Sequence, residues 1–105
     1  EPNFVTTKRL RARVVELEDA LMPADQLEGR IVLIPSADPG YDWLLARPIA
    51  GLITMYGGAN SHMSIRAAEL SLPAAIGVGE RLYASLSAAN ELELDCESRR
   101  FEIIR

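Results

Sequence analysis

Two short apolar runs in the middle of the chain constrain its fold more than any other feature. Residues 30–34 read RIVLI between Gly29 and Pro35, and residues 50–55 read AGLITM before a Gly-Gly pair. Continuous apolar runs of this length, closed by turn-forming residues, are typical of strands that are buried inside a sheet. The chain is therefore expected to contain at least these two buried strands.

Helical and extended patterns alternate around these two runs. Helical segments are predicted at residues 41–46, 61–72 and 80–88, with a turn at residues 36–40 and a loop or short turn at residues 18–29. Further strands are predicted at residues 11–17, 74–76, 92–94 and 101–104, and residues 5–7 can extend. This order predicts an α/β fold with a mixed, partly parallel sheet.

The length of 105 residues fits one compact single domain. We expect residues 27–105 to form the folded unit. Residues 1–26 are interpreted as an N-terminal extension or an interdomain link that can contain a strand. The chain begins with Glu1-Pro2 rather than Met, which suggests a piece of a longer polypeptide.

Composition argues against several classes of function. The formal net charge is -4, and the one basic cluster, at residues 8–13, is followed by acidic residues, so no nucleic-acid partner is expected. No apolar run approaches the ~20 residues that span a bilayer, so no membrane partner is expected. The single cysteine, Cys96, cannot form an internal disulfide, which favours a reducing, cytoplasmic location.

The segment between the second apolar run and the predicted helix at residues 61–72 carries the chemistry. It reads Gly57-Gly58-Ala59-Asn60-Ser61-His62. Glycines let a backbone come close to a ligand, and Ser61 is a good N-cap residue. The remaining N–H groups of a first helical turn, together with the helix dipole, form an anion site. We expect His62 to stand at the first helical position, beside that site.

This position suits a histidine that carries a phosphoryl group. The positive end of a helix disfavours imidazolium, so the ring of His62 should stay neutral and nucleophilic. The same helix end would stabilise the negative charge of a phosphorylated ring. A metal ion is a poorer candidate because a cation would be repelled there, and the sequence has one histidine and no cysteine cluster.

Helical spacing adds two partners to His62. Arg66 and Glu69 lie on the same stripe, so Arg66 can reach a phosphate on His62, and Glu69 can pair with Arg66. Ile65, Ala68 and Leu72 are expected to face the core. Each feature also has an ordinary explanation, since a histidine at a helix start is often only solvated and Arg–Glu pairs are common on surfaces. The pattern by itself leaves both interpretations open.

The segment GLITMYGGANSHMSIRAAELSLPAAIGVG, residues 51–79, resembles the phosphohistidine motif of the phosphoenolpyruvate-utilising enzymes. That family includes phosphoenolpyruvate synthase, pyruvate phosphate dikinase and enzyme I of the sugar phosphotransferase system. The matching positions are Thr54, Gly57, Gly58, Ser61, His62, Ile65, Ala67, Glu69, Leu70, Pro73, Ala74 and Gly77. Residues 27–32, Asp38-Pro39 and residues 92–104 extend the resemblance to residues 27–104.

The resemblance implies the swivelling β/β/α domain of this family, with His62 as the residue that is phosphorylated. Gly57, Gly58, Ser61 and Arg66 would stabilise the phosphate. Supporting roles would fall to Thr54, Asn60 and Glu69. The implied partners are an ATP-grasp nucleotide-binding domain and a phosphoenolpyruvate/pyruvate-binding domain of the same polypeptide. ATP and magnesium would be bound by those partner domains, and no cofactor or metal by this one.

Three positions depart from the family pattern. Asn60 stands where the family has threonine, Met63 where it has a small residue, and Ala68 where it has the arginine of Ala-Arg-Glu, with Arg66 nearby instead. These changes suggest a divergent branch, nearer phosphoenolpyruvate synthase than the dikinase. They also keep open a docking or binding module that retains the fold without phosphotransfer. A hydrolase using Ser61 or Ser64 with His62 is a weaker alternative because no oriented acid is evident.

Overall fold

The two apolar runs form neighbouring parallel strands in a seven-stranded sheet. The computed structural model describes residues 1–17 and 22–105. The order of the strands in the sheet is β1-β5-β4-β3-β2-β6-β7. Their bounds are Asn3–Val5 for β1, Arg9–Glu16 for β2, Ile31–Ser36 for β3, Gly51–Tyr56 for β4, Ala74–Ile76 for β5, Glu91–Asp95 for β6 and Arg100–Ile103 for β7.

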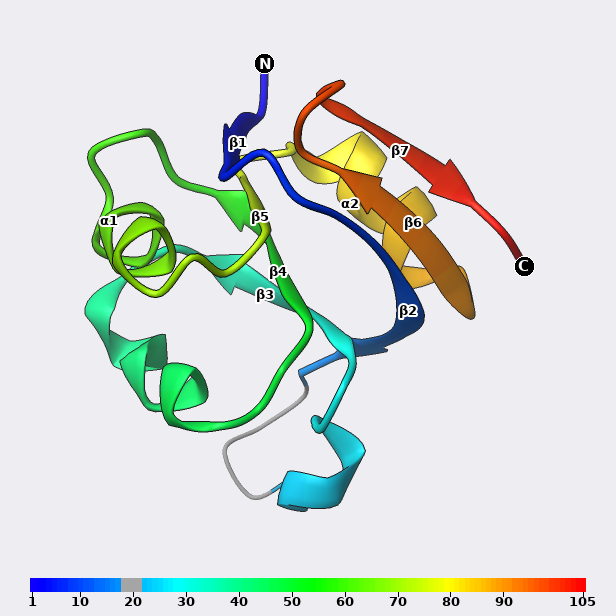
Figure 1. Cartoon of the computed structure of the whole chain (residues 1–105), viewed down its shortest axis with the longest axis horizontal. Helices are drawn as coiled ribbons and strands as arrows, with labels where there is room; N and C mark the ends of the chain where they lie inside the picture. Colours follow the sequence, from blue (N-terminus) through cyan, green and yellow to red (C-terminus); the bar gives the residue numbers. More distant parts are fainter. Residues whose placement is uncertain (18–21) are drawn as a thin grey trace.

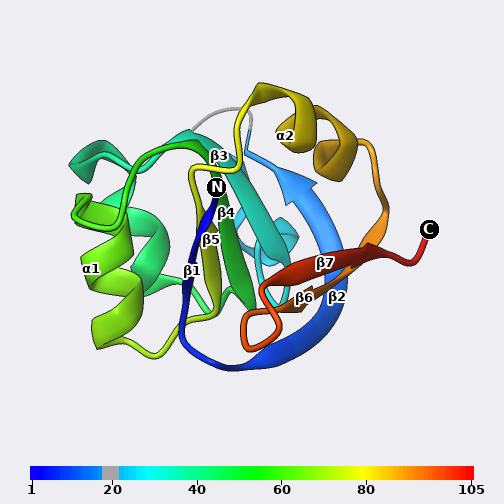
Figure 2. The ribbon, with the colours of Figure 1, turned by 90° about the horizontal axis from the view of Figure 1, so that it is seen from above.

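The sheet is mixed, as the sequence predicts. Strands β2, β3, β4 and β5 are parallel neighbours, whereas β1 pairs antiparallel with β5, β6 with β2, and β7 with β6. Helices α1 (His62–Glu69) and α2 (Glu80–Ser87) lie on opposite sides of the central strands (Figures 1 and 2). The α/β fold of a compact single domain is therefore confirmed.

Alternation along β3 explains why its apolar run is continuous. Val32 and Ile34 are fully buried in one hydrophobic cluster, which includes Met63 and Ala67 of α1. The intervening residues of β3 are buried in a second cluster, which includes side chains of α2 and β6. Successive side chains of a strand point to opposite faces, so a strand that is covered on both faces is apolar at successive positions.

The first 17 residues belong to the same sheet. The strand predicted at residues 11–17 is confirmed as β2, which lies between β3 and β6. Strand β1 also pairs with β5, and the Asn3 side-chain amide donates a 2.9 Å hydrogen bond to Ser64 Oγ on α1. The extension predicted for residues 1–26 therefore does contain strands. Its role as an interdomain link stays a prediction.

Helix α1 is shorter than the predicted residues 61–72. It ends at Glu69 because Ser71 adopts a left-handed conformation with φ of 54°. The Ser71 N–H donates to the Ala68 carbonyl, and the Leu72 N–H donates to the Ala67 carbonyl. These two bonds form a Schellman motif, which usually has glycine at the left-handed position. The end of α1 at Glu69 therefore could not be predicted from the sequence.

The expected core face of α1 is also wrong at two positions. Ile65 is 49% exposed and Ala68 is exposed, whereas the buried residues of the helix are Met63, Ser64 and Ala67. The Met63 N–H donates to the carbonyl of Ala37, just after β3, and this bond turns the side of Met63 toward the sheet. Leu72 does pack partly against the core.

The remaining elements agree closely with the predictions, except that the segment expected to extend at residues 5–7 does so only up to Val5, because Thr6 has φ of 74°. The turn at residues 36–40 and the helical turns at residues 41–46 merge into one 3-10 helix, η2 (Pro39–Ala46), and Ser36 belongs to β3. A second 3-10 helix, η1 (Ala24–Gln26), lies in the predicted loop at residues 18–29, of which residues 18–21 lie outside the described residues. In the described part of the chain, no helix has the length and apolar character to cross a membrane.

Candidate functional site

His62 is the first residue of α1, as predicted. The loop that leaves β4 runs through Gly57 and Gly58 to Ser61, and the helix starts directly after Ser61. The side chain of His62 is 35% exposed, so the imidazole is partly covered and still reachable from outside. The strand–glycine–histidine–helix arrangement inferred from the sequence is therefore present.

Ser61 occupies the N-cap position without capping the helix through its side chain. Its hydroxyl instead donates a 2.7 Å hydrogen bond to the carbonyl of Gly58, which also accepts from the Ser61 N–H. The predicted side-chain cap is therefore wrong, because Ser61 closes the glycine loop. Its role in stabilising a phosphate stays a prediction, as does that of Gly58, which is exposed and has nothing within 4 Å of an added Cβ.

Gly57 is needed for a close approach within the chain itself. It has φ of 135°, and a Cβ at this position would lie 2.5 Å from Ala37 Cβ. Gly77, which follows β5, has φ of 78°, and a Cβ there would lie 2.2 Å from the carbonyl oxygen of Gly57. The two glycines let the ends of β4 and β5 touch, and this contact fixes the start of the loop that leads to His62.

Thr54 stabilises the same contact between the ends of β4 and β5. Its side chain is fully buried in β4, where Oγ1 donates to the Tyr56 carbonyl and accepts from the Gly77 N–H, both at 2.9 Å. The supporting role predicted for Thr54 thus has a structural counterpart, in which it connects β4 to the segment after β5. Asn60 is exposed in the loop, and its supporting role stays a prediction.

Replacement of Thr54 by valine tests this contact. The variant keeps the shape of the side chain and removes both hydroxyl hydrogen bonds, so we expect it to lose about 1–2 kcal/mol of unfolding free energy. Urea unfolding measures this loss, with Thr7→Val as the control, because Thr7 is exposed and such a change should stay within about 0.5 kcal/mol. Equal stability of the two variants would contradict the role of the Thr54 hydroxyl.

Asp42 of η2 contacts His62, and no pattern in the sequence points to this residue. Its Oδ1 lies 2.6 Å from His62 Nε2, and the same oxygen accepts a 3.2 Å hydrogen bond from Arg66 Nε. The hydrogen bond from His62 makes the largest contribution to lowering the pKa of Asp42 below its ordinary value, and Arg66 adds to it. Asp42 is therefore ionised at neutral pH and acts as an acceptor.

Arg66 lies one turn after His62, on the predicted stripe. Besides its bond to Asp42, it donates from a terminal guanidinium nitrogen to Glu69 Oε1 at 2.8 Å. The pairing of Arg66 with Glu69 is therefore present. Glu69 binds one edge of the guanidinium, while Nε of the same group donates to Asp42, the residue that contacts the imidazole. One continuous series of polar contacts therefore joins four side chains: Asp42, His62, Arg66 and Glu69.

A shallow hollow of about 350 Å³ opens in front of His62. Its lining residues come from the ends of β3 and β4 and from the start of η2 and α1: Ser36, Ala37, Asp38, Pro39, Tyr56, Gly57, Ser61 and His62. The Tyr56 hydroxyl donates to Glu80 Oε2 at the start of α2, which holds the tyrosine in place at the rim. The hollow gives an incoming group access to the histidine.

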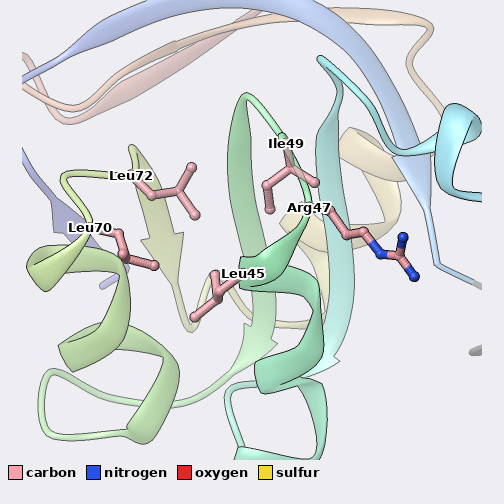
Figure 3. A pocket seen from close by; sticks show the side chains of 5 residues that line it. All are labelled: Leu45, Arg47, Ile49, Leu70 and Leu72. Carbon is pink, nitrogen blue, oxygen red and sulfur yellow. The ribbon is translucent and has the colours of Figure 1, made fainter.

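Among the residues that the structure describes, no group of three or more His, Cys, Asp or Glu side chains could hold a metal ion. A pocket of about 190 Å³ lies at the far end of α1, between that helix and η2, and its lining includes Arg47 beside the apolar side chains of Leu45, Leu70 and Leu72 (Figure 3). It is separate from the hollow at His62.

Comparison with known proteins gives a consistent result. Residues 26–99 match the family model described as "PEP-utilising enzyme, mobile domain". The chain is 46% identical over 50 residues to a phosphoenolpyruvate-protein phosphotransferase of Haloferax volcanii, which covers 48% of this chain. It is 32% identical over 77 residues to a phosphoenolpyruvate synthase of Aquifex aeolicus, which covers 72% of this chain.

The chain spans about 9% of the length of each of these curated relatives. The matched residues include the glycine loop, His62 and the whole of α1, and they run from η1 to the turn before β7. The resemblance seen in the sequence is therefore confirmed over most of the chain: this protein belongs to the family of mobile domains of the phosphoenolpyruvate-utilising enzymes.

Proposed function

We propose that this chain is the phosphoryl-carrier domain of a multidomain phosphotransferase that resembles phosphoenolpyruvate synthase. The observation that carries the proposal is the position of His62, at the start of α1, open to a surface hollow, with Arg66 one turn along. The names of the two relatives support a phosphotransferase or synthase role. Their much greater length is consistent with further domains in the same polypeptide.

In the proposed reaction, a lone pair on the imidazole of His62 attacks a phosphoryl group. A nitrogen–phosphorus bond forms, and the bond between phosphorus and the donor oxygen breaks, with its electron pair leaving on the donor. The helix N-terminus and the guanidinium of Arg66 offset the negative charge that arrives on the ring. The transfer then reverses onto the acceptor, so one side chain serves both half-reactions.

The domain would move between two active sites of the parent enzyme, each in a different partner domain. We propose that an ATP-grasp domain phosphorylates His62 and that a phosphoenolpyruvate/pyruvate-binding domain exchanges the group with pyruvate. ATP and magnesium would be bound by those partner domains. The carrier supplies a nucleophile on a rigid α/β body, and its partners supply the metal and the remaining electrostatic stabilisation.

A phosphorylation experiment with the parent enzyme tests this function. Incubation with ATP and Mg²⁺ should give a protein-bound phosphate that is labile in acid and stable in base, as expected for phosphohistidine. His62→Ala should abolish that phosphate while the far-UV circular dichroism stays unchanged, because His62 lies outside both hydrophobic clusters. An equally strong signal from the alanine variant would remove His62 from the mechanism. No signal from either protein would favour a docking module that only retains the fold.

A further inference from the structure

Asp42 occupies the side of His62 on which a phosphoryl group attached to Nε2 would lie. A single oxygen, Asp42 Oδ1, lies within hydrogen-bond distance of both His62 Nε2 and Arg66 Nε. A phosphoryl group bonded to Nε2 would place its oxygens in the same region, within reach of the same guanidinium. The carboxylate and the phosphoryl group therefore compete for one position and for one arginine.

The charges make this competition one-sided. A phosphoryl group carries nearly two negative charges, and Asp42 carries one, so the two groups repel each other at contact distance. The hydrogen bonds of Arg66 are stronger with the phosphoryl group than with the Asp42 carboxylate, because the phosphoryl group carries more charge and its oxygens match the geometry of a guanidinium. Asp42 can leave at little cost, because its side chain is 45% exposed and can turn toward water.

We propose that Asp42 is a positioning residue that holds His62 in the unphosphorylated chain and whose side chain turns away when the phosphoryl group arrives. This inference rests on the proposed function of His62. Before phosphorylation, the Asp42 carboxylate accepts a hydrogen bond from the Nε2–H of His62, and this bond fixes the orientation of the imidazole ring. After phosphorylation, Arg66 binds the phosphoryl group instead of Asp42. The position of the Asp42 side chain on the surface therefore differs between the phosphorylated and the unphosphorylated domain. A partner domain that contacts η2 can thereby distinguish the two states.

The proton balance follows from the contact. Through solvent, the single ring proton moves from Nε2 to Nδ1, and the lone pair that this leaves on Nε2 attacks phosphorus. The Nδ1 proton is then released to solvent, so the phosphorylated ring is neutral. With phosphoramidate as the donor, the new nitrogen–phosphorus bond replaces the one to the amino group, which leaves as ammonia after taking up a proton. This small donor needs no partner domain, so the reaction can be followed on this chain.

The sequence provides two clean reporters for the experiment. His62 is the only histidine and Trp43, next to Asp42, is the only tryptophan in the chain. Trp43 is partly buried against the core, and its fluorescence should respond to a change in the position and charge environment of the neighbouring Asp42 side chain. Imidazole ¹⁵N signals report which ring nitrogen carries the proton, and ³¹P signals report the phosphoryl group.

The test compares the wild-type chain with Asp42→Asn, and with Asp25→Asn as a charge-matched control on the exposed η1. We expect the wild-type ring to carry its proton on Nε2 and the Trp43 emission to shift on phosphorylation. The neutral amide of Asp42→Asn can remain beside the phosphoryl group. This variant should therefore show less than about half of the emission shift. Its phosphohistidine half-life should be at least about fivefold longer, which is the factor for removing the repulsion of one pair of unit charges at about 4 Å in water. Asp25→Asn should behave as the wild type.

The outcomes separate the inference from the function on which it rests. A phosphorylated His62 with the same half-life and the same emission shift in Asp42→Asn would overturn the role of Asp42 and leave the carrier function intact. A ring proton on Nδ1 in the unphosphorylated wild-type chain would also overturn it. A failure to label His62 in any variant, with Nε2 still protonated against Asp42, would count against the carrier function and, with it, against the withdrawal of Asp42.

Discussion

Gly77→Ala is expected to lose about 3 kcal/mol or more of unfolding free energy, a large part of the 5–15 kcal/mol typical of a domain. Two penalties add at this position. The backbone has φ of 78°, which alanine adopts only with strain, and the new Cβ would lie 2.2 Å from the carbonyl oxygen of Gly57. The backbone oxygen cannot move away cheaply, because Gly57 itself packs against Ala37.

Urea unfolding with Gly29→Ala as a matched control separates the two penalties. Gly29 also has a positive φ, of 69°, but an added Cβ would have nothing within 4 Å. This control should therefore lose only the conformational part, about 1 kcal/mol. If the two variants lose the same free energy, the contact between the ends of β4 and β5 does not hold the loop before His62 in the way described.

Arg66→Ala is expected to slow the phosphorylation of His62 in the parent enzyme by about tenfold or more. The guanidinium provides charge-assisted hydrogen bonds to the arriving phosphoryl group, and such bonds contribute about 1.5–3 kcal/mol each. The partial exposure of Arg66 places the effect at the lower end of that range. The initial rate of acid-labile phosphate formation from ATP measures it.

Two further variants make this prediction specific. Arg66→Lys keeps the charge and loses the two-pronged geometry, so its rate should fall between those of the wild type and the alanine variant. Arg81→Ala removes an arginine from the exposed face of α2 and should leave the rate unchanged. A wild-type rate in Arg66→Ala would show that the arginine serves only the contacts with Asp42 and Glu69.

Much of this architecture follows from local patterns in the sequence. The runs in β3 and β4 are apolar almost throughout because both faces of the sheet are covered, and such runs are recognisable without a structure. The loop and helix around His62 are equally local, because the double glycine, the serine and the histidine lie within one six-residue segment, residues 57–62. The pairing of Arg66 with Glu69 follows from helical spacing alone.

The features that were missed depend on contacts between distant segments or on unusual local chemistry. Asp42 is 20 residues away from His62 in the sequence, and only the packing of η2 beside α1 brings them together. The end of α1 depends on Ser71 in a conformation that favours glycine. The buried face of α1 depends on a backbone bond from Met63 to Ala37. No periodicity within the helix encodes that bond.

The most direct test of the central claim is to locate the phosphate on the labelled parent enzyme. Tandem mass spectrometry of base-stabilised peptides, together with the ³¹P spectrum, identifies the atom type and the residue that carry it. The account predicts one phosphoryl group, bonded to nitrogen, on the peptide that contains His62. An acid-stable phosphate ester on Ser61 or Ser64, with His62 unmodified, would contradict it.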